Sequence, residues 1–326
     1  MSDEKAQKYS NPFSAVYTGI AELFRKYEPA GELRPADRLD GKTVLIDGAS
    51  SGLGFAIALE TARRGAKVIM ACRSGIPGKG ELVKKLSGND KVFMLPVDFT
   101  DFVSIRELVS VIRDRFAPVD ILICNSAVVT RRSRQTPAGL DEMFQVNYLS
   151  KFFYINLLVR EGIFRTDPVP RIVIVSSESH RNPDGFDWDS FGLYRPFGIG
   201  RSVEVYSYNK LYLTAFVCEF SRRLNPGGRT AFSVFSLCPG PINSNIAREA
   251  PKIFQPLMKL VFGIFFRSPE RAAVPVIYLA ASNDLEGKPF DYFFLMTRKE
   301  VDPKAADPVN GKMLWERSEE LLRDVL

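Results

Sequence analysis

A glycine-rich turn between an apolar strand and an apolar helix most constrains the fold of this chain. Residues 43–47 (TVLID) form a short apolar run that predicts a buried strand. The turn that follows contains Gly48, Gly52 and Gly54, and a helix-forming stretch begins at Phe55. Glycines allow a tight turn and close approach of a ligand, and free N–H groups at a helix start favour negative charge. The segment predicts a site for a dinucleotide pyrophosphate, with a plain strand-to-helix turn as the alternative.

The next apolar segment completes a βαβ unit and bears on the choice of cofactor. Residues 66–72 (AKVIMAC) predict a second buried strand. In such units an acidic residue at the end of this strand binds the adenosine ribose 2′-hydroxyl, whereas a basic residue accommodates a 2′-phosphate. Cys72 and Arg73 occupy that place. Arg73 therefore favours NADP over NAD, unless it is only a solvated strand-end residue.

Further apolar runs alternate with helix-length segments along the chain. They cover residues 92–95, 121–123, 172–175 and 232–235. With 326 residues, of which 45% are hydrophobic, the chain can bury a large core. This alternation predicts an α/β fold, with a Rossmann-type doubly wound parallel sheet flanked by helices in a single domain.

Tyr206 and Lys210 are the strongest chemical signal in the sequence. Tyr206 is the only one of the 11 tyrosines with a lysine four residues later, and this spacing puts both side chains on one helix face. A phenol is a poor acid or base at neutral pH unless a nearby cation favours its phenolate. The pair suits proton transfer to a carbonyl oxygen, and its alternative is a surface Tyr and Lys on an ordinary helix.

With these motifs the chain resembles the short-chain dehydrogenase/reductase family, and within it the retinol dehydrogenase branch. The resemblance covers residues from about 39 to 326, and residues 312–319 resemble the C-terminal helix of that branch. The family's glycine motif is matched by Gly48, Gly52 and Gly54, and its acidic residue beside the adenine ring by Asp98. The resemblance implies a cofactor site made of Gly48, Ser50, Ser51, Gly52, Leu53, Gly54, Arg73, Asp98, Asn125, Tyr206, Lys210, Pro239, Gly240, Ile242 and Ser244.

The resemblance also implies a catalytic tetrad of Asn147, Ser177, Tyr206 and Lys210. In this reading Tyr206 is the acid/base, and Lys210 lowers its pKa and hydrogen-bonds the nicotinamide ribose. Ser177 hydrogen-bonds the substrate oxygen and stabilises the charge that develops there. Asn147 holds a water that links Lys210 to solvent. The alternatives are a strand-end serine at position 177 and a backbone-bonded helix residue at position 147.

Two departures from the family pattern concern the cofactor site. Asp47 replaces the family's threonine before the first glycine, and repulsion from the pyrophosphate would weaken binding unless Asp47 faces away or finds a partner. Residues 124–127 (CNSA) replace the family's NNAG stretch, and Ala127 lacks the freedom of glycine at positive φ.

The charge, cysteine and histidine content bears on nucleic-acid binding, metal binding and the cellular setting. The net charge is +6, basic residues are spread along the chain, and no nucleic-acid module is predicted. Residues 131–134 (RRSR) are the one basic cluster, either a solvated loop or an anion contact. The four cysteines show no C-x-x-C spacing and the sole histidine is His180, so we predict no metal site and a cytoplasmic setting. His180 is predicted to be a hydrogen-bonded loop residue rather than a catalytic one.

Two segments outside the predicted core are expected to contact other surfaces. Residues 1–40 form an arm without a signal peptide, with an amphipathic helix that begins near Asn11 and ends before Pro29; residues 41–326 form the dinucleotide-binding catalytic domain. The helix packs on protein or lies at a membrane surface. An apolar run within residues 242–268 is too short to span a bilayer, which takes roughly 20 residues. It predicts a substrate lid, with membrane contact, core packing or a homodimer interface as alternatives.

The sequence as a whole predicts an NADP(H)-dependent oxidoreductase. It would transfer hydride between nicotinamide and a carbonyl or alcohol of a lipophilic small molecule, and the resemblance suggests retinoid-like, steroid-like or fatty aldehyde substrates. One rival is a non-catalytic NADP(H)-binding regulator of the same fold. The other is a biosynthetic ketoreductase or hydroxysteroid dehydrogenase with a narrow substrate.

Overall fold

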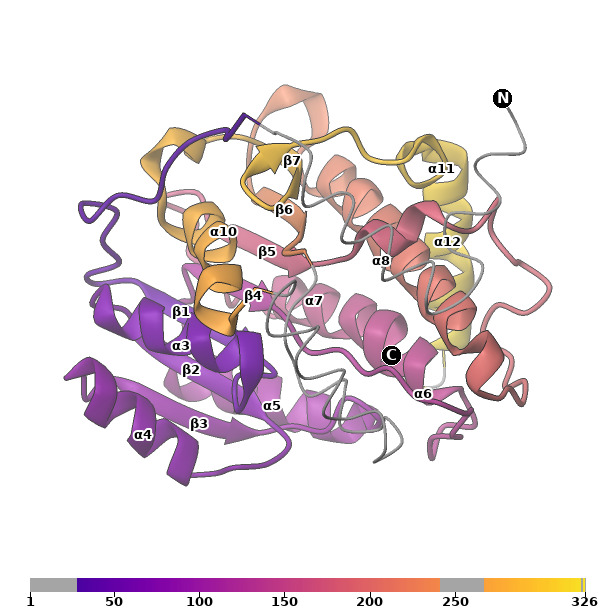
Figure 1. Cartoon of the computed structure of the whole chain (residues 1–326), viewed down its shortest axis with the longest axis horizontal. Coiled ribbons are helices and arrows are strands. Elements are labelled where there is room, and N and C mark those ends of the chain that lie inside the picture. The colour runs from indigo at the N-terminus through magenta and orange to yellow at the C-terminus, as the bar shows by residue number, and fades with distance from the viewer. Residues whose placement is uncertain (1–27, 241–266, 324, 326) are drawn as a thin grey trace.

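An eight-stranded sheet forms the centre of the protein. The computed structural model describes residues 28–240, 267–323 and 325, and its strand order is β3-β2-β1-β4-β5-β6-β7-β8 (Figure 1). Strands β1 to β7 pair in parallel, and the short β8 pairs antiparallel with β7. The strands are β1 (Thr43–Asp47), β2 (Lys67–Cys72), β3 (Val92–Pro96), β4 (Ile121–Cys124), β5 (Arg171–Val175), β6 (Ser233–Cys238), β7 (Phe290–Phe294) and β8 (Thr297–Arg298).

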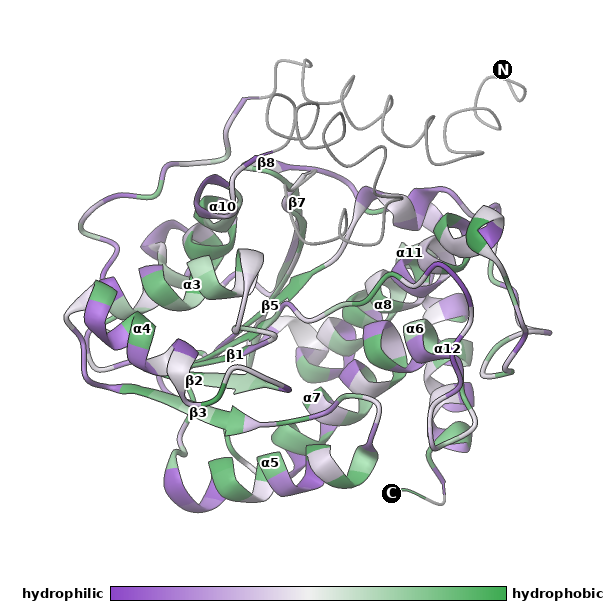
Figure 2. Ribbon diagram, turned by 60° about the horizontal axis from the view of Figure 1, so that its bottom comes forward, coloured by the Kyte–Doolittle hydropathy of each residue, from purple (hydrophilic) through white to green (hydrophobic). Residues whose placement is uncertain are grey.

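Helices cover both faces of the sheet and bury two apolar cores. One core lies beneath α3 and α10, which pack against each other, and α4; the other lies beneath α5, α7, α8 and α12. Figure 2 shows the apolar strands between these two layers. Burial on both faces explains why the central strands are continuous apolar runs rather than alternating ones. The helices are α3 (Gly52–Arg63), α4 (Gly78–Ser87), α5 (Phe102–Arg115), α6 (Glu142–Phe144), α7 (Ser150–Arg160), α8 (Ser202–Leu224), α10 (Pro269–Ala281), α11 (Pro303–Ala306) and α12 (Pro308–Leu321).

The doubly wound parallel sheet predicted from the sequence is confirmed, with each of the six predicted strands in place. Strands β7 and β8, at one end of the sheet, were not predicted. The predicted helix of the N-terminal arm and residues 242–266 of the predicted lid lie outside the described residues, so both stay predictions. None of the helices in the described ranges is both long enough and apolar enough to cross a bilayer.

The C-terminal helix α12 is held against α8 by one large aromatic side chain. Trp315 is 9% exposed, and its ring centroid lies 4.9 Å from that of Phe152 and 6.0 Å from that of Phe216. The guanidinium of Arg223 lies 4.1 Å from the centroid of the same indole ring. Burial of a tryptophan removes a large apolar area from water, so Trp315 anchors α12 to the core.

We expect Trp315→Ala to lower the free energy of unfolding by about 3 to 5 kcal/mol, because it leaves a cavity between α7, α8 and α12. Urea denaturation followed by circular dichroism measures the change. Met313→Ala on the same helix is the control, since Met313 is 38% exposed and its loss leaves no comparable cavity. Equal losses in the two variants would contradict the anchoring role.

Candidate active site

A cavity of about 660 Å³ lies at the carboxyl ends of the parallel strands. In parallel sheets these ends meet at one edge, which is where ligands bind in open α/β folds. Among the residues predicted from the sequence, the cavity is lined by Gly48, Ser50, Ser51, Gly52, Leu53, Gly54, Arg73, Asp98, Asn125, Ser177, Tyr206, Lys210, Pro239 and Gly240. Asn147 lies outside this lining, and Ile242 and Ser244 fall outside the described residues.

The turn between β1 and α3 has the features of a phosphate-binding loop. Gly48 has φ +65°, which favours glycine, and a Cβ there would lie 2.8 Å from the Cα of Ser126. At Gly54 a Cβ would lie 2.2 Å from the carbonyl oxygen of Gly48, so only glycine fits. The first residues of α3 have no side-chain cap from Ser51, which leaves their N–H groups free to bind an anion.

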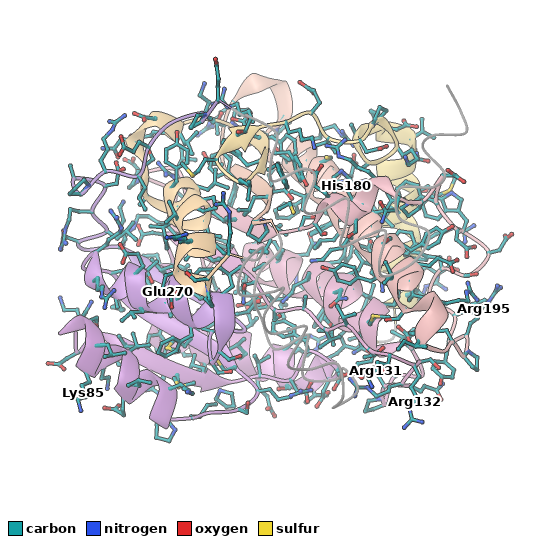
Figure 3. All side chains as sticks on the ribbon, viewed as in Figure 1. Lys85, Arg131, Arg132, His180, Arg195 and Glu270 are labelled. Atoms are coloured by element: carbon teal, nitrogen blue, oxygen red, sulfur yellow. The ribbon has the colours of Figure 1, made fainter. Side chains whose placement is uncertain are left out.

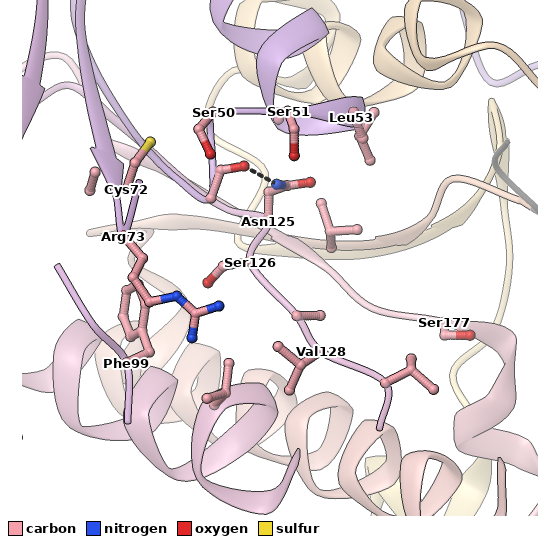
Figure 4. A pocket seen from close by; sticks show the side chains of 18 of the residues that line it. Ser50, Ser51, Leu53, Cys72, Arg73, Phe99, Asn125, Ser126, Val128 and Ser177 are labelled. Atoms are coloured by element: carbon pink, nitrogen blue, oxygen red, sulfur yellow. Dashed lines mark hydrogen bonds between the residues drawn. The ribbon is translucent and has the colours of Figure 1, made fainter. Parts of the chain in front are cut away.

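Asn125 ties the loop after β4 to this turn. Its side-chain Nδ2 donates to the carbonyl oxygen of Gly48 at 3.1 Å (Figure 4). The neighbouring Ala127, where the family has glycine, carries no backbone strain, because Leu295 is the only non-glycine residue with positive φ among those described. The altered loop therefore keeps its contact with the phosphate turn.

Asp47 has a positively charged partner, which reduces the repulsion that its carboxylate would exert on a pyrophosphate. Its side chain is fully buried, and its Oδ1 accepts a hydrogen bond from the backbone N–H of Asn125 at 2.8 Å and another from that of Ser126. Its Oδ2 lies 2.7 Å from Nζ of Lys151, itself 2% exposed. The carboxylate thus links the end of β1 to the loop after β4 and is neutralised by a buried lysine.

The end of the cavity predicted to bind the adenosine contains both predicted side chains, Arg73 and Asp98. Arg73 lines it directly after β2, and its guanidinium points into the cavity (Figure 4). Asp98 follows β3, and its Oδ1 accepts hydrogen bonds from the backbone N–H and the hydroxyl of Thr100, at 2.9 and 2.8 Å. These contacts hold the Asp98 carboxylate at the cavity wall.

Tyr206 and Lys210 both face the cavity from α8. Nζ of Lys210 lies 5.6 Å from the centroid of the Tyr206 ring and donates to the carbonyl oxygen of Val175 at 3.0 Å. Burial lowers the pKa of Lys210 to about 8. Burial raises the pKa of Tyr206, with the thiol of Cys238 adding to the rise and the Ser177 hydroxyl opposing it, which is opposite to the direction expected from Lys210 alone. The phenol is therefore held protonated at neutral pH.

Ser177 follows β5 and is supported by the short helix after it. Its hydroxyl oxygen lies 2.9 Å from that of Ser179 and accepts the Ser179 N–H at 3.2 Å. The buried His180 has Nδ1 2.7 Å from the carbonyl oxygen of Ser177, and its Nε2 accepts the N–H of Asp302 at 3.4 Å. Burial lowers the pKa of His180 to about 4. His180 is thus a neutral, hydrogen-bonded residue, as predicted, and its ring contacts the backbone carbonyl of Ser177.

Asn147 fixes the loop after β4 rather than lining the cavity. It lies in a short π-helix, Gln145–Leu149, where such widened turns often accompany function. Its Oδ1 accepts from the N–H of Val128 and its Nδ2 donates to the carbonyl oxygen of Val128, both at 2.8 Å. This backbone contact was the alternative considered for Asn147; the predicted water-holding role stays a prediction.

Sequence reasoning missed several residues of the site. Lys151 is the most important, and a buried acid at position 47 was the signal for it, because a buried charge requires a partner. Arg134, from the basic cluster, lines the cavity itself and pairs with Glu142, whereas Arg131 and Arg132 lie at the edge of the molecule (Figure 3). The apolar members of the lining that were missed are Ala71, Val97, Phe99, Val128, Val129, Val146 and Val175.

Comparison with known proteins agrees with this geometry. The profile of the short chain dehydrogenase family matches residues 42–186. Retinol dehydrogenase 14 of Homo sapiens is 33% identical over 298 residues, which cover 86% of each chain. The chain belongs to the short-chain dehydrogenase/reductase family. Retinol dehydrogenase 13 of Homo sapiens is 31% identical, over 97% of this chain and 95% of that protein. The chain is thus a short-chain dehydrogenase/reductase of the retinol dehydrogenase-like branch.

A solved structure extends this similarity to the fold. An uncharacterised protein from Mycobacterium Paratuberculosis has a TM-score of 0.66 and 27% identity, over 90% of this chain and 98% of that one. Members of the short-chain dehydrogenase/reductase family are oxidoreductases that bind a nicotinamide cofactor and act on small molecules. The phosphate turn, the free start of α3 and the cavity after the parallel strands fit such a cofactor.

Because His180 is buried and its pKa is lowered to about 4, we expect the protein to lose stability in acid. Above pH 6.5 the histidine is neutral in both the folded and the unfolded chain, so it does not make the free energy of unfolding depend on pH. As the pH falls from about 6.5 to about 4, only the unfolded chain binds the proton, so the free energy of unfolding drops by about 3 kcal/mol. Urea denaturation at a series of pH values measures this.

His180→Gln is the matched control for this prediction, because it removes the chain's only histidine and keeps a side chain of similar reach. The variant should be less stable at pH 7 and should lose the drop between about pH 6.5 and 4. An unchanged slope in the variant would show that other groups cause the acid loss.

Proposed function

We propose that this chain is an NADP(H)-dependent oxidoreductase that interconverts a carbonyl and an alcohol on a lipophilic small molecule. The observation that carries the proposal is the convergence of Ser177, Tyr206 and Lys210 on one cavity that also contains the phosphate turn. When bound, a nicotinamide cofactor supplies the hydride chemistry of the family. The uncapped start of α3 would hold its pyrophosphate and Lys210 its ribose.

The protein's own groups would handle the proton. In reduction, the Tyr206 hydroxyl protonates the substrate oxygen while the Ser177 hydroxyl donates a hydrogen bond to the same oxygen. The Lys210 ammonium, 5.6 Å from the phenol ring, stabilises the phenolate that forms. In oxidation the same phenolate removes the proton of the alcohol. Burial raises the pKa of Tyr206 and so keeps its hydroxyl protonated, and the nearby Lys210 ammonium favours release of that proton to the substrate.

The lipophilic substrate is supported by the lining of the cavity and by the relatives. Val128, Val129 and Val146 give the cavity an apolar wall on the side of the loop after β4. Two relatives carry the name retinol dehydrogenase, so we propose a retinoid-like, steroid-like or fatty aldehyde substrate. A cytoplasmic location, peripheral contact with a membrane and a homodimer complete the proposal, and each is an expectation from the sequence.

We expect purified protein to oxidise NADPH with all-trans-retinal, decanal or a ketosteroid, and Tyr206→Phe to lower kcat at least about a hundredfold, because it removes the proton donor. Absorbance at 340 nm follows the reaction. Tyr208→Phe is the matched control, since Tyr208 lies on the same helix but does not line the cavity, and it should keep full activity. NADPH binding without turnover of any substrate would favour the regulator. Turnover of one compound only would favour the narrow ketoreductase.

Arg73→Ala should raise the KM for NADPH by about ten- to a hundredfold and leave the KM for NADH unchanged, because only NADPH carries a 2′-phosphate. Initial rates with each cofactor measure the effect. Arg63→Ala, on the last turn of α3 and outside the cavity, is the control. Equal changes for both cofactors would show that Arg73 has no part in choosing between them.

The rate of carbonyl reduction should fall as the pH rises through about 8, where Lys210 loses the proton that stabilises the phenolate. The sign follows from the lowered pKa of Lys210, because the useful cation exists only below it. A pH profile of kcat/KM measures this fall, which forms the alkaline limb of the profile. Lys210→Arg keeps the cation to higher pH and should move this limb upward. A limb that stays in place in this variant would assign it to another group.

A further inference from the structure

Asp47 and Lys151 form a buried ion pair that is absent from the predicted catalytic and cofactor-binding residues. The Asp47 carboxylate ends β1 and is fully buried, whereas Lys151 lies in the first turn of α7 and is 2% exposed, with their atoms 2.7 Å apart. The sequence separation is 104 residues. Burying a charge pair costs desolvation free energy, so we asked what this pair contributes to the cavity beside it.

The contacts of Lys151 extend beyond the carboxylate. Its Nζ also donates to the hydroxyl of Ser126 and lies 3.8 Å from the centroid of the Phe99 ring. Ser126 and Phe99 both line the cavity, Phe99 at the end near Asp98. The ammonium therefore touches the outer side of the wall whose inner side faces the cofactor site.

The contacts of Asp47 join the two loops that form the cofactor site. Through Oδ1 the carboxylate holds the backbone N–H groups of Asn125 and Ser126, and Asn125 in turn contacts Gly48 of the phosphate turn. The pair thus connects β1, the loop after β4 and α7 at one point.

The two charges of the pair also affect the electrostatic potential at Lys210. The groups that interact electrostatically with Lys210 are Cys238 at the end of β6, Lys151 from α7 and Asp47 from β1, and the Tyr206 ring lies 5.6 Å from its Nζ. Burial is the main cause of the lowered pKa of Lys210; the Cys238 thiol raises this pKa, Lys151 lowers it further and Asp47 raises it. Around the pair itself stand Cys124 and Tyr154, whose pKa values are raised by burial and so stay neutral.

We propose that Asp47 and Lys151 are positioning residues that hold the loop of Asn125 and Ser126 against the phosphate turn and set the charge balance felt by Lys210. This inference rests on the proposed oxidoreductase function. A cation removed from the neighbourhood raises the pKa of every nearby group, and an anion removed lowers it. The two partners should therefore have opposite electrostatic effects, although both support the same loop.

The test compares Asp47→Asn, Lys151→Met and the double variant by the pH profile of kcat/KM. Lys151→Met should move the alkaline limb upward by about half a unit or more, and Asp47→Asn should move it downward by a similar amount. The double variant, which leaves no unpaired buried charge, should return the limb close to its wild-type position. It also serves where a single variant fails to fold.

The matched control is Asp120→Asn. Asp120 is a buried carboxylate at the opposite end of the same two strands, where it accepts the N–H of Thr43 at 2.8 Å and pairs with Arg165 at 2.6 Å. Its loss should cost stability without moving the pH profile. Shifts in the same direction for both Asp47→Asn and Lys151→Met, or none in either, would overturn the proposal and leave the pair a purely structural contact.

A second readout does not depend on turnover. Titration of NADPH, followed by its fluorescence, should give a dissociation constant raised about tenfold or more in Lys151→Met, because an unpaired carboxylate then lies beneath the phosphate site, and restored in the double variant. If the wild type binds NADPH but turns over no substrate, the proposed function fails while this arm still tests the pair. An unchanged dissociation constant in Lys151→Met would overturn the positioning role.

Discussion

The parallel pairing of β1 to β7 is the constraint on which the rest of the structure depends. Because parallel strands end at the same edge, the residues that follow β1, β2, β3, β4, β5 and β6 are brought to one cavity. The sheet thereby assembles a phosphate turn, the side chains of Arg73 and Asp98, and the hydroxyl of Ser177 from segments far apart in the chain. Tyr206 and Lys210 reach the same cavity from helix α8.

Burial of charge is the second recurring theme. Asp47 is the last residue of β1 and is fully buried, where a neutral side chain would cost less desolvation free energy. Two backbone N–H groups and Lys151 compensate it, and the same pair of charges acts on Lys210. At the other end of these strands, Asp120 is paired in a similar way with Arg165. The two carboxylates fix β1 and β4 to each other at both ends.

Local patterns in the sequence predicted the fold well. The runs at residues 43–47, 66–72 and 172–175 are apolar because both sheet faces are covered, and the glycines at positions 48 and 54 follow from backbone geometry and space. Long-range features had no such signal. The run FDYFF of β7 reads as a strand only once β6 lies beside it, and the Lys151 partner of Asp47 lies 104 residues away. The direction of the Tyr206 pKa depends on burial, which spacing alone does not reveal.

In the proposed reaction, hydride moves directly between the nicotinamide ring and a substrate carbon at the cavity lined by Ser177 and Tyr206. The most direct measurement uses NADPH that carries deuterium at both C4 positions, with the alcohol product analysed by mass spectrometry. The proposed mechanism predicts one deuterium on the former carbonyl carbon of each product molecule, and at least about a hundredfold less labelled product from Tyr206→Phe in the same time. A product formed without deuterium would contradict it.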